Sequence, residues 1–545
     1  MSFRERHSIA FLNITQSLAV INDNIYRFVM AYMLIDILGK SQTTFILSFA
    51  GATYVVPFLL FSSWAGVLAD RFSKQRLVIL MKFVELALMI AAIFVFVARH
   101  TWATYLILFF MATRDAIFSP SKYGIIPELV PREKVSRSNG IISGTTYLSI
   151  ILGTFFASLF TEATHRNYPL IGGITSLIAF IGLIAAFGIK YTKPQHTEKR
   201  FHLFFFREIF RTLKTSRKIP HLFPVINGDA FFLFIGGYTQ LNVIPFVMQS
   251  LGFSEIAGGY FFLLTAFGIA VGALIAGRIS RTRIEIGLSC IASAFMGITF
   301  WLLDAFAFSV GASATLLFVM GVFGGMYIVP LDSYIQVMSG DQIRGQMIGA
   351  TNFLGFVWIL GASACLYFFS DVFTLSASGN FTIIGFFSII AAFILMFRLS
   401  DYFFSFLSSK FLFRLLRFHP PAKATLASVE HSILIVDNAR WRDVFLLPGL
   451  FPQMHMITPS THRSFFKRLF YSIHPVRDSG AIHIALREAK ILLDQGLIPC
   501  IVLHAPWPAK GTEIAREHAY PLIFVHIARD ASSKLTAQFL TQENE

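Results

Sequence analysis

The chain has 545 residues, of which 55% are hydrophobic and only 14% are charged, and its mean hydropathy is +0.65. A composition this apolar excludes an ordinary soluble globular protein and indicates a membrane protein. The net charge of +15 does not indicate a nucleic-acid partner, because the cations lie in loops between apolar segments. The three widely spaced cysteines predict no disulfide framework, and the sequence indicates no metal site and no cofactor.

Twelve apolar segments are each long enough to cross a bilayer as a helix. The first has no small-residue cleavage site after it, so we expect it to remain as an anchor and not to be removed as a signal peptide. The predicted spans cover about 9–35, 44–68, 77–98, 102–124, 139–162, 168–189, 221–249, 255–277, 284–304, 308–332, 344–370 and 379–398.

Lysine and arginine are distributed unequally over the loops between these spans. One side of the predicted membrane carries 21 of them, nine of which lie in 190–218, and the other side carries three, at Lys40, Arg99 and Arg166. Because cytoplasmic loops carry the excess of cations, we expect both termini in the cytoplasm. The sequence therefore predicts a multi-pass protein of the bacterial inner (plasma) membrane.

The basic stretch 190–218 separates six spans from six. The predicted fold is an all-α polytopic membrane protein with 12 transmembrane helices in two six-helix bundles, followed by a small α/β cytoplasmic domain. A weak repeat supports two related halves, because Ala69-Asp-Arg71 after the second span matches Ala276-Gly-Arg278 after the eighth. The expected parts are 1–189, the linker 190–220, 221–400, the membrane-surface linker 401–428 and the C-terminal domain 429–545.

The loop between the second and third spans, Gly66–Arg76, combines a small-residue helix end with an acid, Asp70, and several cations. Small residues let helices approach closely, and a carboxylate beside an arginine forms charge-assisted pairs that a neighbouring helix end can join or leave. The loop resembles the one between helices 2 and 3 of the major facilitator superfamily, although Ser73 replaces the preferred glycine. The resemblance implies a cytoplasmic gate, and the alternative is a basic loop that only fixes topology. The gate residues would be Gly66, Asp70, Arg71, Lys74 and Arg76.

Polar side chains inside the spans are costly, so each one is a candidate for lining a substrate path. Helical spacing places Gln16, Asp23 and Arg27 on one face of the first span. The alternative is that Asp23 and Arg27 only neutralise one another; Lys82 and Glu85 have the spacing of a similar pair. The candidate path residues are Gln16, Asn22, Asp23, Asn24, Arg27, Glu85, Arg114, Asp115, Asp229 and Asp332.

The run 118–140 is the most specific motif of the chain, since prolines break the cytoplasmic end of the fourth span among crowded charges. Together with Asn22-Asp23-Asn24, and with the stretches 323–336 and 344–353, it resembles the lysophospholipid transporter branch of the major facilitator superfamily. The motif residues are Pro120, Lys122, Tyr123, Pro127, Glu128, Asn139 and Gly140. The resemblance implies a flippase that moves lysophospholipids, such as lysophosphatidylethanolamine, to the cytoplasmic leaflet for reacylation. Its partners would be this substrate, membrane lipids and a separate acyltransferase.

Two other functions remain open from the sequence. A proton-coupled exporter of small molecules shares the Gly66–Arg76 loop but does not predict the run 118–140. A bifunctional transporter would add acyl transfer to lysophospholipid in the C-terminal domain. There, a basic amphipathic segment at 410–417 precedes β-like runs at 432–436, 499–503 and 522–527 and a helical pattern at 480–494.

This C-terminal domain resembles the glycerophospholipid acyltransferase that is joined to such transporters in a related family. In the first matching block, 433–443, Asn438 replaces the catalytic histidine while Asp443 keeps the partner acid. In the second, 496–506, Leu-His504-Ala-Pro replaces Phe-Pro-Glu-Gly. Because asparagine is no general base at neutral pH, we expect an inactive acyltransferase-like domain and a transporter that is not an enzyme. A base relocated to His504 or His431 is the alternative.

Overall fold

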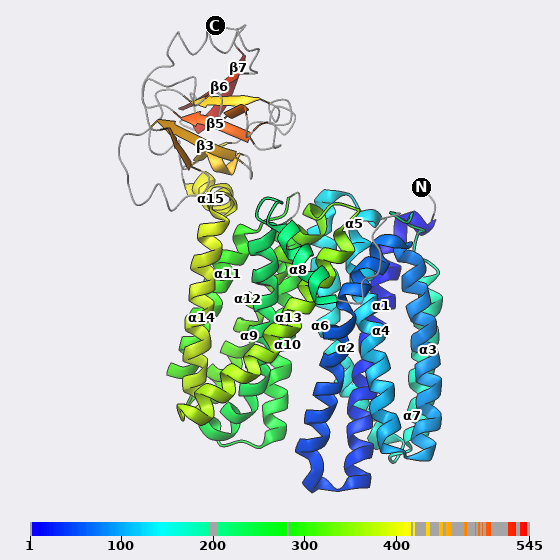
Figure 1. Ribbon diagram of the computed structural model, residues 1–545. Helices are drawn as coiled ribbons and strands as arrows, with labels where there is room; N and C mark the ends of the chain where they lie inside the picture. Colours follow the sequence, from blue (N-terminus) through cyan, green and yellow to red (C-terminus); the bar gives the residue numbers. More distant parts are fainter. Residues whose placement is uncertain are drawn as a thin grey trace. The chain divides into compact units, whose positions relative to one another are not determined.

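The fold is that of a computed structural model (Figure 1). It describes residues 3–195, 205–280, 283–415, 418–419, 432–436, 446–450, 454–459, 473–476, 486, 489–490, 493, 498–502, 522–529 and 535–541. The chain divides into two compact units. The helical unit comprises residues 1–284 and 291–392, and the C-terminal unit comprises 285–290 and 393–545.

The first half of the helical unit, blue to cyan in Figure 1, contains six long helices. Helix α1 packs against α6 and α7, α2 packs against α4, and α3 packs against α4 and α7. The helices are α1 (Phe3–Leu38), α2 (Thr43–Arg71), α3 (Lys74–Ala98), α4 (Thr101–Gly124), α6 (Val135–Ala163) and α7 (Tyr168–Ala186). Shorter turns are η1 (Lys40–Gln42), α5 (Ile126–Leu129) and η2 (Arg132–Lys134).

The second half follows the linker helix α8 (Phe205–Ser216) and is green to yellow-green in Figure 1. Helix α10 packs along α12, and α13 packs along α9. The helices are α9 (Leu222–Leu251), α10 (Glu255–Ile279), α11 (Gly287–Ala305), α12 (Val310–Met338), α13 (Arg344–Tyr367) and α14 (Ala377–Arg398), with a π-helical turn η3 (Phe368–Val372) after α13.

Each half has its own apolar core, and in each core a buried tyrosine hydrogen-bonds to another helix. The Tyr26 hydroxyl donates to the carbonyl of Thr104 at 2.9 Å, and the Tyr238 hydroxyl donates to Asn380 Oδ1 at 2.8 Å. Both rings are essentially inaccessible to solvent. By contrast, many large apolar side chains remain exposed on the long helices, as expected for helices that face lipid.

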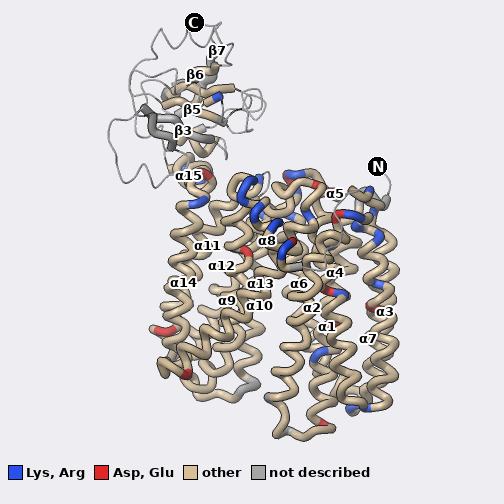
Figure 2. Tube along the Cα trace, in the orientation of Figure 1, with Lys and Arg blue, Asp and Glu red and all other residues tan. Residues whose placement is uncertain are grey.

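Among the described helices, eleven are long and apolar enough to cross a membrane, which is one fewer than predicted. The exception is α4, the predicted span 102–124. This 24-residue helix packs against α2 and α3, but Arg114 and Asp115 lie side by side within it and lower its hydropathy. Figure 2 shows that lysine and arginine gather at the end of the helical unit where α5 and α8 lie, which agrees with the predicted loop asymmetry.

The C-terminal unit contains a seven-stranded sheet in the order β1-β7-β6-β2-β5-β3-β4, parallel throughout except for β6 and β7. The strands are β1 (Phe418–His419), β2 (Ile433–Val436), β3 (Met454–Pro459), β4 (Ile473–Val476), β5 (Ile498–Val502), β6 (Leu522–Arg529) and β7 (Leu535–Thr541). The other described elements are α15 (Ser400–Leu407), η4 (Ser408–Leu412), α16 (Phe413–Leu415) and η5 (Leu447–Gly449). The three predicted strands match β2, β5 and β6, and every residue of β2 is buried, as in the centre of a parallel sheet.

Candidate functional site

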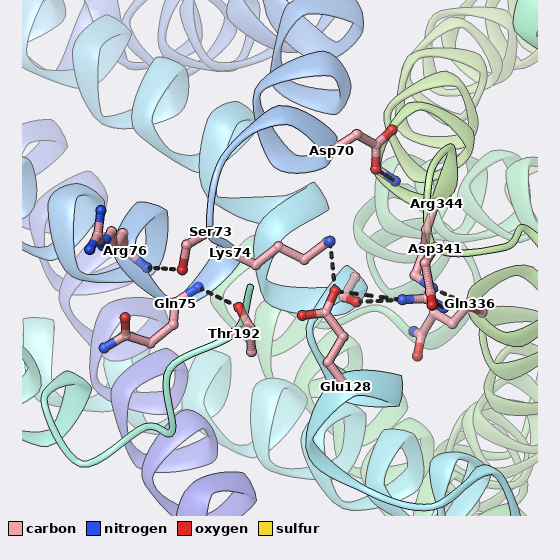
Figure 3. Close-up of polar contacts among 12 residues, drawn as sticks. Asp70, Ser73, Lys74, Gln75, Arg76, Glu128, Thr192, Gln336, Asp341 and Arg344 are labelled. Atoms are coloured by element: carbon pink, nitrogen blue, oxygen red, sulfur yellow. Dashed lines mark hydrogen bonds and ion pairs between the residues drawn. The ribbon is translucent and has the colours of Figure 1, made fainter. Parts of the chain in front are cut away.

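The predicted gate loop ends at the start of a helix in the opposite half. The Asp70 carboxylate, at the end of α2, accepts hydrogen bonds from the backbone N–H groups of Gly345 at 2.6 Å and Gln346 at 3.0 Å, and from Gln346 Nε2 at 3.1 Å (Figure 3). The first N–H groups of a helix have no partner within the helix, and the helix dipole favours a negative charge there. Asp70 therefore caps α13 from the other half of the molecule.

Glycines allow α2 and α13 to approach closely enough for this cap. A Cβ atom on Gly66 would lie 2.7 Å from Gln346 Cα and from the Gly345 carbonyl oxygen, and one on Gly345 would lie 2.6 Å from the Gly66 carbonyl oxygen. Both contacts are with backbone, so a larger side chain would force the two helices apart.

A second set of charges joins the halves beside Asp70. Lys74 Nζ lies 2.7 Å from Glu128 Oε1, and Arg344 Nη1 lies 3.7 Å from the same oxygen (Figure 3). Arg344 also donates to the carbonyl of Gln336 at 2.6 Å and pairs with Asp341. One carboxylate on α5 thus holds a cation from each half.

The other seam between the halves joins α6 to α10 and α12. Asn139 Nδ2 donates to Ser333 Oγ at 3.0 Å and to Gln336 Oε1 at 2.9 Å, and Gln336 Nε2 donates back to Asn139 Oδ1 at 3.1 Å. A Cβ atom on Gly140 would lie 2.6 Å from the Ala273 carbonyl oxygen, so this glycine is also required by close helix contact.

A buried charge network lies inside the first half. Arg114 on α4 pairs with Asp23 on α1, and its Nη1 atom lies 3.2 Å from Glu85 Oε2 and 3.1 Å from Asp115 Oδ1. Glu85 also pairs with Lys82 at 2.7 Å, as the spacing of these two residues predicted. A carboxylate this deep in a membrane protein requires paired cations, and here two cations serve three carboxylates.

The remaining candidates of the first span surround this network. Asn22 Nδ2 donates to Glu85 Oε1 at 3.4 Å, and Asn24 donates to a carbonyl one turn back in its own helix. The Arg27 guanidinium lies 4.2 Å from the centre of the Tyr54 ring, which is a cation–π contact. Asp23 pairs with Arg114 and Arg27 stacks on Tyr54, so the structure does not show the alternative in which Asp23 and Arg27 only neutralise one another.

A cavity of about 210 Å³ lies between the halves. Asp229 on α9 and Asp332 on α12 contribute the two carboxyl groups of its wall. The opposite wall includes Thr146, whose hydroxyl donates to Gln16 Oε1 at 2.9 Å. The remaining lining residues are Tyr123, Ser143, Tyr147, Ile150, Phe232, Leu233, Ile328, Ile335, Gln336, Ile348, Thr351 and Asn352.

Comparison with known proteins decides the family. Residues 12–363 match the family model of the Major Facilitator Superfamily, and this stretch is more than half of the chain. The chain belongs to this superfamily. It is therefore a multi-pass membrane transporter.

Solved structures of the same fold have little sequence similarity to this transporter. The human organic anion transporter MFSD10 is 16% identical, with a TM-score of 0.58 over 72% of this chain and 99% of that chain. The fucose:proton symporter FucP of E. coli is 13% identical, with a TM-score of 0.58 over 72% of this chain and 98% of that chain. These likenesses establish the fold.

Curated relatives are similar over about half of the transporter. The lysophospholipid transporter LplT of Photorhabdus laumondii is 25% identical over 298 residues, which are 54% of this chain and 71% of that protein. LplT of Escherichia coli O1:K1 is 24% identical over 306 residues, which are 54% of this chain and 74% of that protein.

The structure brings part of the predicted gate together. Gly66, Asp70 and Lys74 meet the second half at the seam between α2 and α13, whereas Arg76 stacks on Tyr191 at 5.3 Å and Arg71 lies over the ring of Phe72 at 5.9 Å. Sequence reasoning did not assign Glu128 to this gate and missed Gly345. Signals were nevertheless present, because an acid after two helix-breaking prolines and an Arg-Gly pair at the start of a span are both unusual.

The residues of the run 118–140 likewise lie at two places, some at the contacts between the halves and others at the cavity. Glu128 and Asn139 join the halves, Tyr123 lines the cavity, and Pro127 starts the short helix α5. Lys122 is buried, and its ammonium group lies 4.4 Å from the centre of the Tyr123 ring. Pro120 lies within the last turns of α4.

The two halves of the transporter are in contact at the end of the helical unit where the basic loops lie (Figure 2). Both seams, at Asp70 and at Asn139, lie at the ends of helices next to basic loops. Figure 1 shows the two halves in contact at this end and diverging toward the opposite end.

The predicted acyltransferase positions Asn438, Asp443 and His504 lie outside the described residues. The strands before them are described, and β2 pairs with β5 in parallel, with Val436 opposite Val502. The two sequence blocks therefore begin at the same edge of the sheet. The inactive acyltransferase-like domain stays a prediction.

Proposed function

We propose that this transporter moves lysophospholipids from the outer to the cytoplasmic leaflet of the bacterial inner membrane by alternating access. The similarity to LplT proteins over more than two thirds of their length carries the proposal. The charges inside the protein support it, because a zwitterionic headgroup needs both signs of charge along its path. The first half supplies a network centred on Arg114, and the second half supplies Asp229 and Asp332.

The test is inward movement of a fluorescent lysophosphatidylethanolamine in spheroplasts with and without the protein. We expect uptake to require the protein and to fall at least about tenfold in Asp23→Asn, because this change removes a partner of the buried Arg114. Asp36→Asn is the matched control, since Asp36 also lies on α1 and pairs with an arginine, but at an exposed site. Uptake that is the same without the protein would refute the proposal.

A proton-coupled exporter of small molecules is the second candidate. Asp229 and Asp332 favour it, because two carboxyl groups that line one buried cavity can take up and release a proton. Dissipating the proton gradient separates the two functions. Proton-driven export should stop, whereas lipid movement governed by headgroup recognition should continue.

A further inference from the structure

The second half presents an acidic pair to the cavity. Asp229 and Asp332 project from neighbouring helices, α9 and α12, and both line the cavity. Asp229 is buried, with 7% of the residue exposed, and its Oδ2 atom has no hydrogen-bond partner in the described structure. An acceptor oxygen that is buried, lines a cavity and lacks a donor is poised for a ligand that donates hydrogen bonds.

The groups around this pair supply little compensating positive charge. The titratable side chains that line the cavity from the facing helices are Tyr123 on α4 and Tyr147 on α6. The rest of the cavity lining is uncharged. Two adjacent buried carboxyl groups are stable only with a proton or a bound cation between them.

A cation stands on the opposite side of the pair. Lys122 is buried, and within the described part of the chain no carboxylate lies at ion-pair distance from its ammonium group. Its ammonium group lies 4.4 Å from the centre of the ring of Tyr123, which lines the cavity. The second half thus contributes the carboxyl groups of the cavity, and a cation of the first half lies behind the lining residue Tyr123.

We propose that this cavity binds the zwitterionic headgroup of a lysophospholipid with its primary ammonium group on Asp229 and Asp332 and its phosphate toward Lys122. The inference rests on the proposed function and specifies the headgroup. The arriving ammonium donates hydrogen bonds to both carboxylates and takes the place of the proton between them, which passes to water. A trimethylammonium group has no N–H donor, and a glycerol headgroup has no positive charge, so neither satisfies the pair.

The experiment compares uptake of three fluorescent lysophospholipids with the same acyl chain and ethanolamine, glycerol or choline headgroups into proteoliposomes. For the wild type we expect the ethanolamine lipid to move fastest. In Asp229→Asn and in Asp332→Asn we expect the ratio of ethanolamine to glycerol lipid uptake to fall by about tenfold or more, the effect of removing one partner of a desolvated charge pair. Asp229→Glu, which keeps the charge, should restore part of this ratio.

The matched control is Asp304→Asn. Asp304 lies on α11, accepts a hydrogen bond from Thr382 at 2.6 Å and is not among the lining residues, so it makes the same charge change outside the cavity. A second measurement needs no transport. In protein whose three native cysteines are replaced by serine, glycerophosphoethanolamine should slow maleimide labelling of Thr146→Cys, and glycerophosphoglycerol should not.

The outcomes distinguish the inference from the function on which it rests. If the wild type moves none of the three lipids, the proposed function fails. If the wild type moves them but the aspartate variants leave the uptake ratio unchanged, or reduce uptake of all three lipids equally, the headgroup assignment is overturned. The two aspartates would then act in proton transfer or in the stability of the fold.

Discussion

Asp70 satisfies two backbone N–H groups that α13 cannot satisfy itself, and it belongs to the other half of the protein. Only a charged carboxylate has the oxygens and the sign for this position, since asparagine would present an N–H donor to one of the two amides. A negative charge at a helix N-terminus contributes up to about 2 kcal/mol when partly buried. The cap therefore favours the state in which α2 and α13 are in contact over the alternative in which they separate.

Replacing Asp70 by asparagine should expose the first turn of α13. We expect amide hydrogen exchange at Gly345 and Gln346 to become roughly tenfold faster, because opening of the seam then costs less free energy. Hydrogen-exchange mass spectrometry of the peptide around residue 345 measures this. Asp371→Asn, at an exposed position after α13, is the control. Unchanged exchange would show that Asp70 does not hold the seam.

Arg114 is the residue whose loss should cost most stability. Arg114→Gln leaves Asp23, Glu85 and Asp115 buried with one remaining cation, so we expect a loss of about 3–5 kcal/mol in the free energy of unfolding. Arg166→Gln breaks an arginine–aspartate pair whose arginine side chain is 66% exposed, and it should cost less than about 1 kcal/mol. Denaturant unfolding of both purified variants in detergent provides the comparison, and equal losses would contradict the assignment.

The site could be predicted from the sequence as a set of residues but not as a set of contacts. Helical spacing correctly paired Lys82 with Glu85, because both lie on one helix. The same spacing left an Asp23–Arg27 pair open as an alternative, but Asp23 pairs with Arg114 from α4 and Arg27 stacks on Tyr54 from α2. Spacing within a helix gives the available partners, whereas packing between helices decides among them.

At the scale of the helices, glycines set how closely the two halves approach. Gly66 and Gly51 both lie within α2, but a Cβ atom on Gly66 would meet the backbone of α13, and one on Gly51 would meet nothing within 4 Å. Replacing each glycine by alanine therefore separates two effects on the same helix. Gly66→Ala disturbs the contact between α2 and α13, whereas Gly51→Ala changes only the helix propensity of α2.

Gly66→Ala should open the cytoplasmic seam, whereas Gly51→Ala should stabilise α2 by about 1 kcal/mol without changing the gate. The measurement is disulfide formation between cysteines placed at Asn139 and Ser333, whose side chains are in contact in the closed state, after the native cysteines are replaced by serine. We expect a lower yield of this disulfide with Gly66→Ala only. A reduced yield with Gly51→Ala as well would contradict the role of close contact.

Helix positions followed well from hydropathy. The boundary between two six-helix halves at 190–218 stays a prediction. The count of spans did not follow from hydropathy, because α4 combines the length of a span with charges that belong to a buried network. The sheet of the C-terminal unit was predicted as three short strands, but its order joins strands far apart in the chain, which local patterns do not reveal.

For the whole molecule, the halves are in contact at the end that carries the basic loops, which we expect to face the cytoplasm, and this predicts that the cavity is reached from outside. A cysteine at Thr146 should react with a membrane-impermeant maleimide in spheroplasts and several-fold more slowly in inverted vesicles. A cysteine at the exposed Ser41, between α1 and α2, should react only in spheroplasts and reports the orientation of the chain. Faster labelling of Thr146→Cys in inverted vesicles, with the Ser41 control as expected, would show a resting state open to the cytoplasm.

The charges within α4 also bear on how the protein enters the membrane during synthesis. An arginine or aspartate at the centre of a span raises the free energy of its insertion by about 2.5–3.5 kcal/mol, so α4 alone is a poor substrate for the translocon. Its partners Asp23 and Glu85 lie on α1 and α3, which leave the ribosome earlier. The ion pairs of the finished protein thus favour insertion of α4 together with the preceding helices, and this part of the fold must assemble during translation.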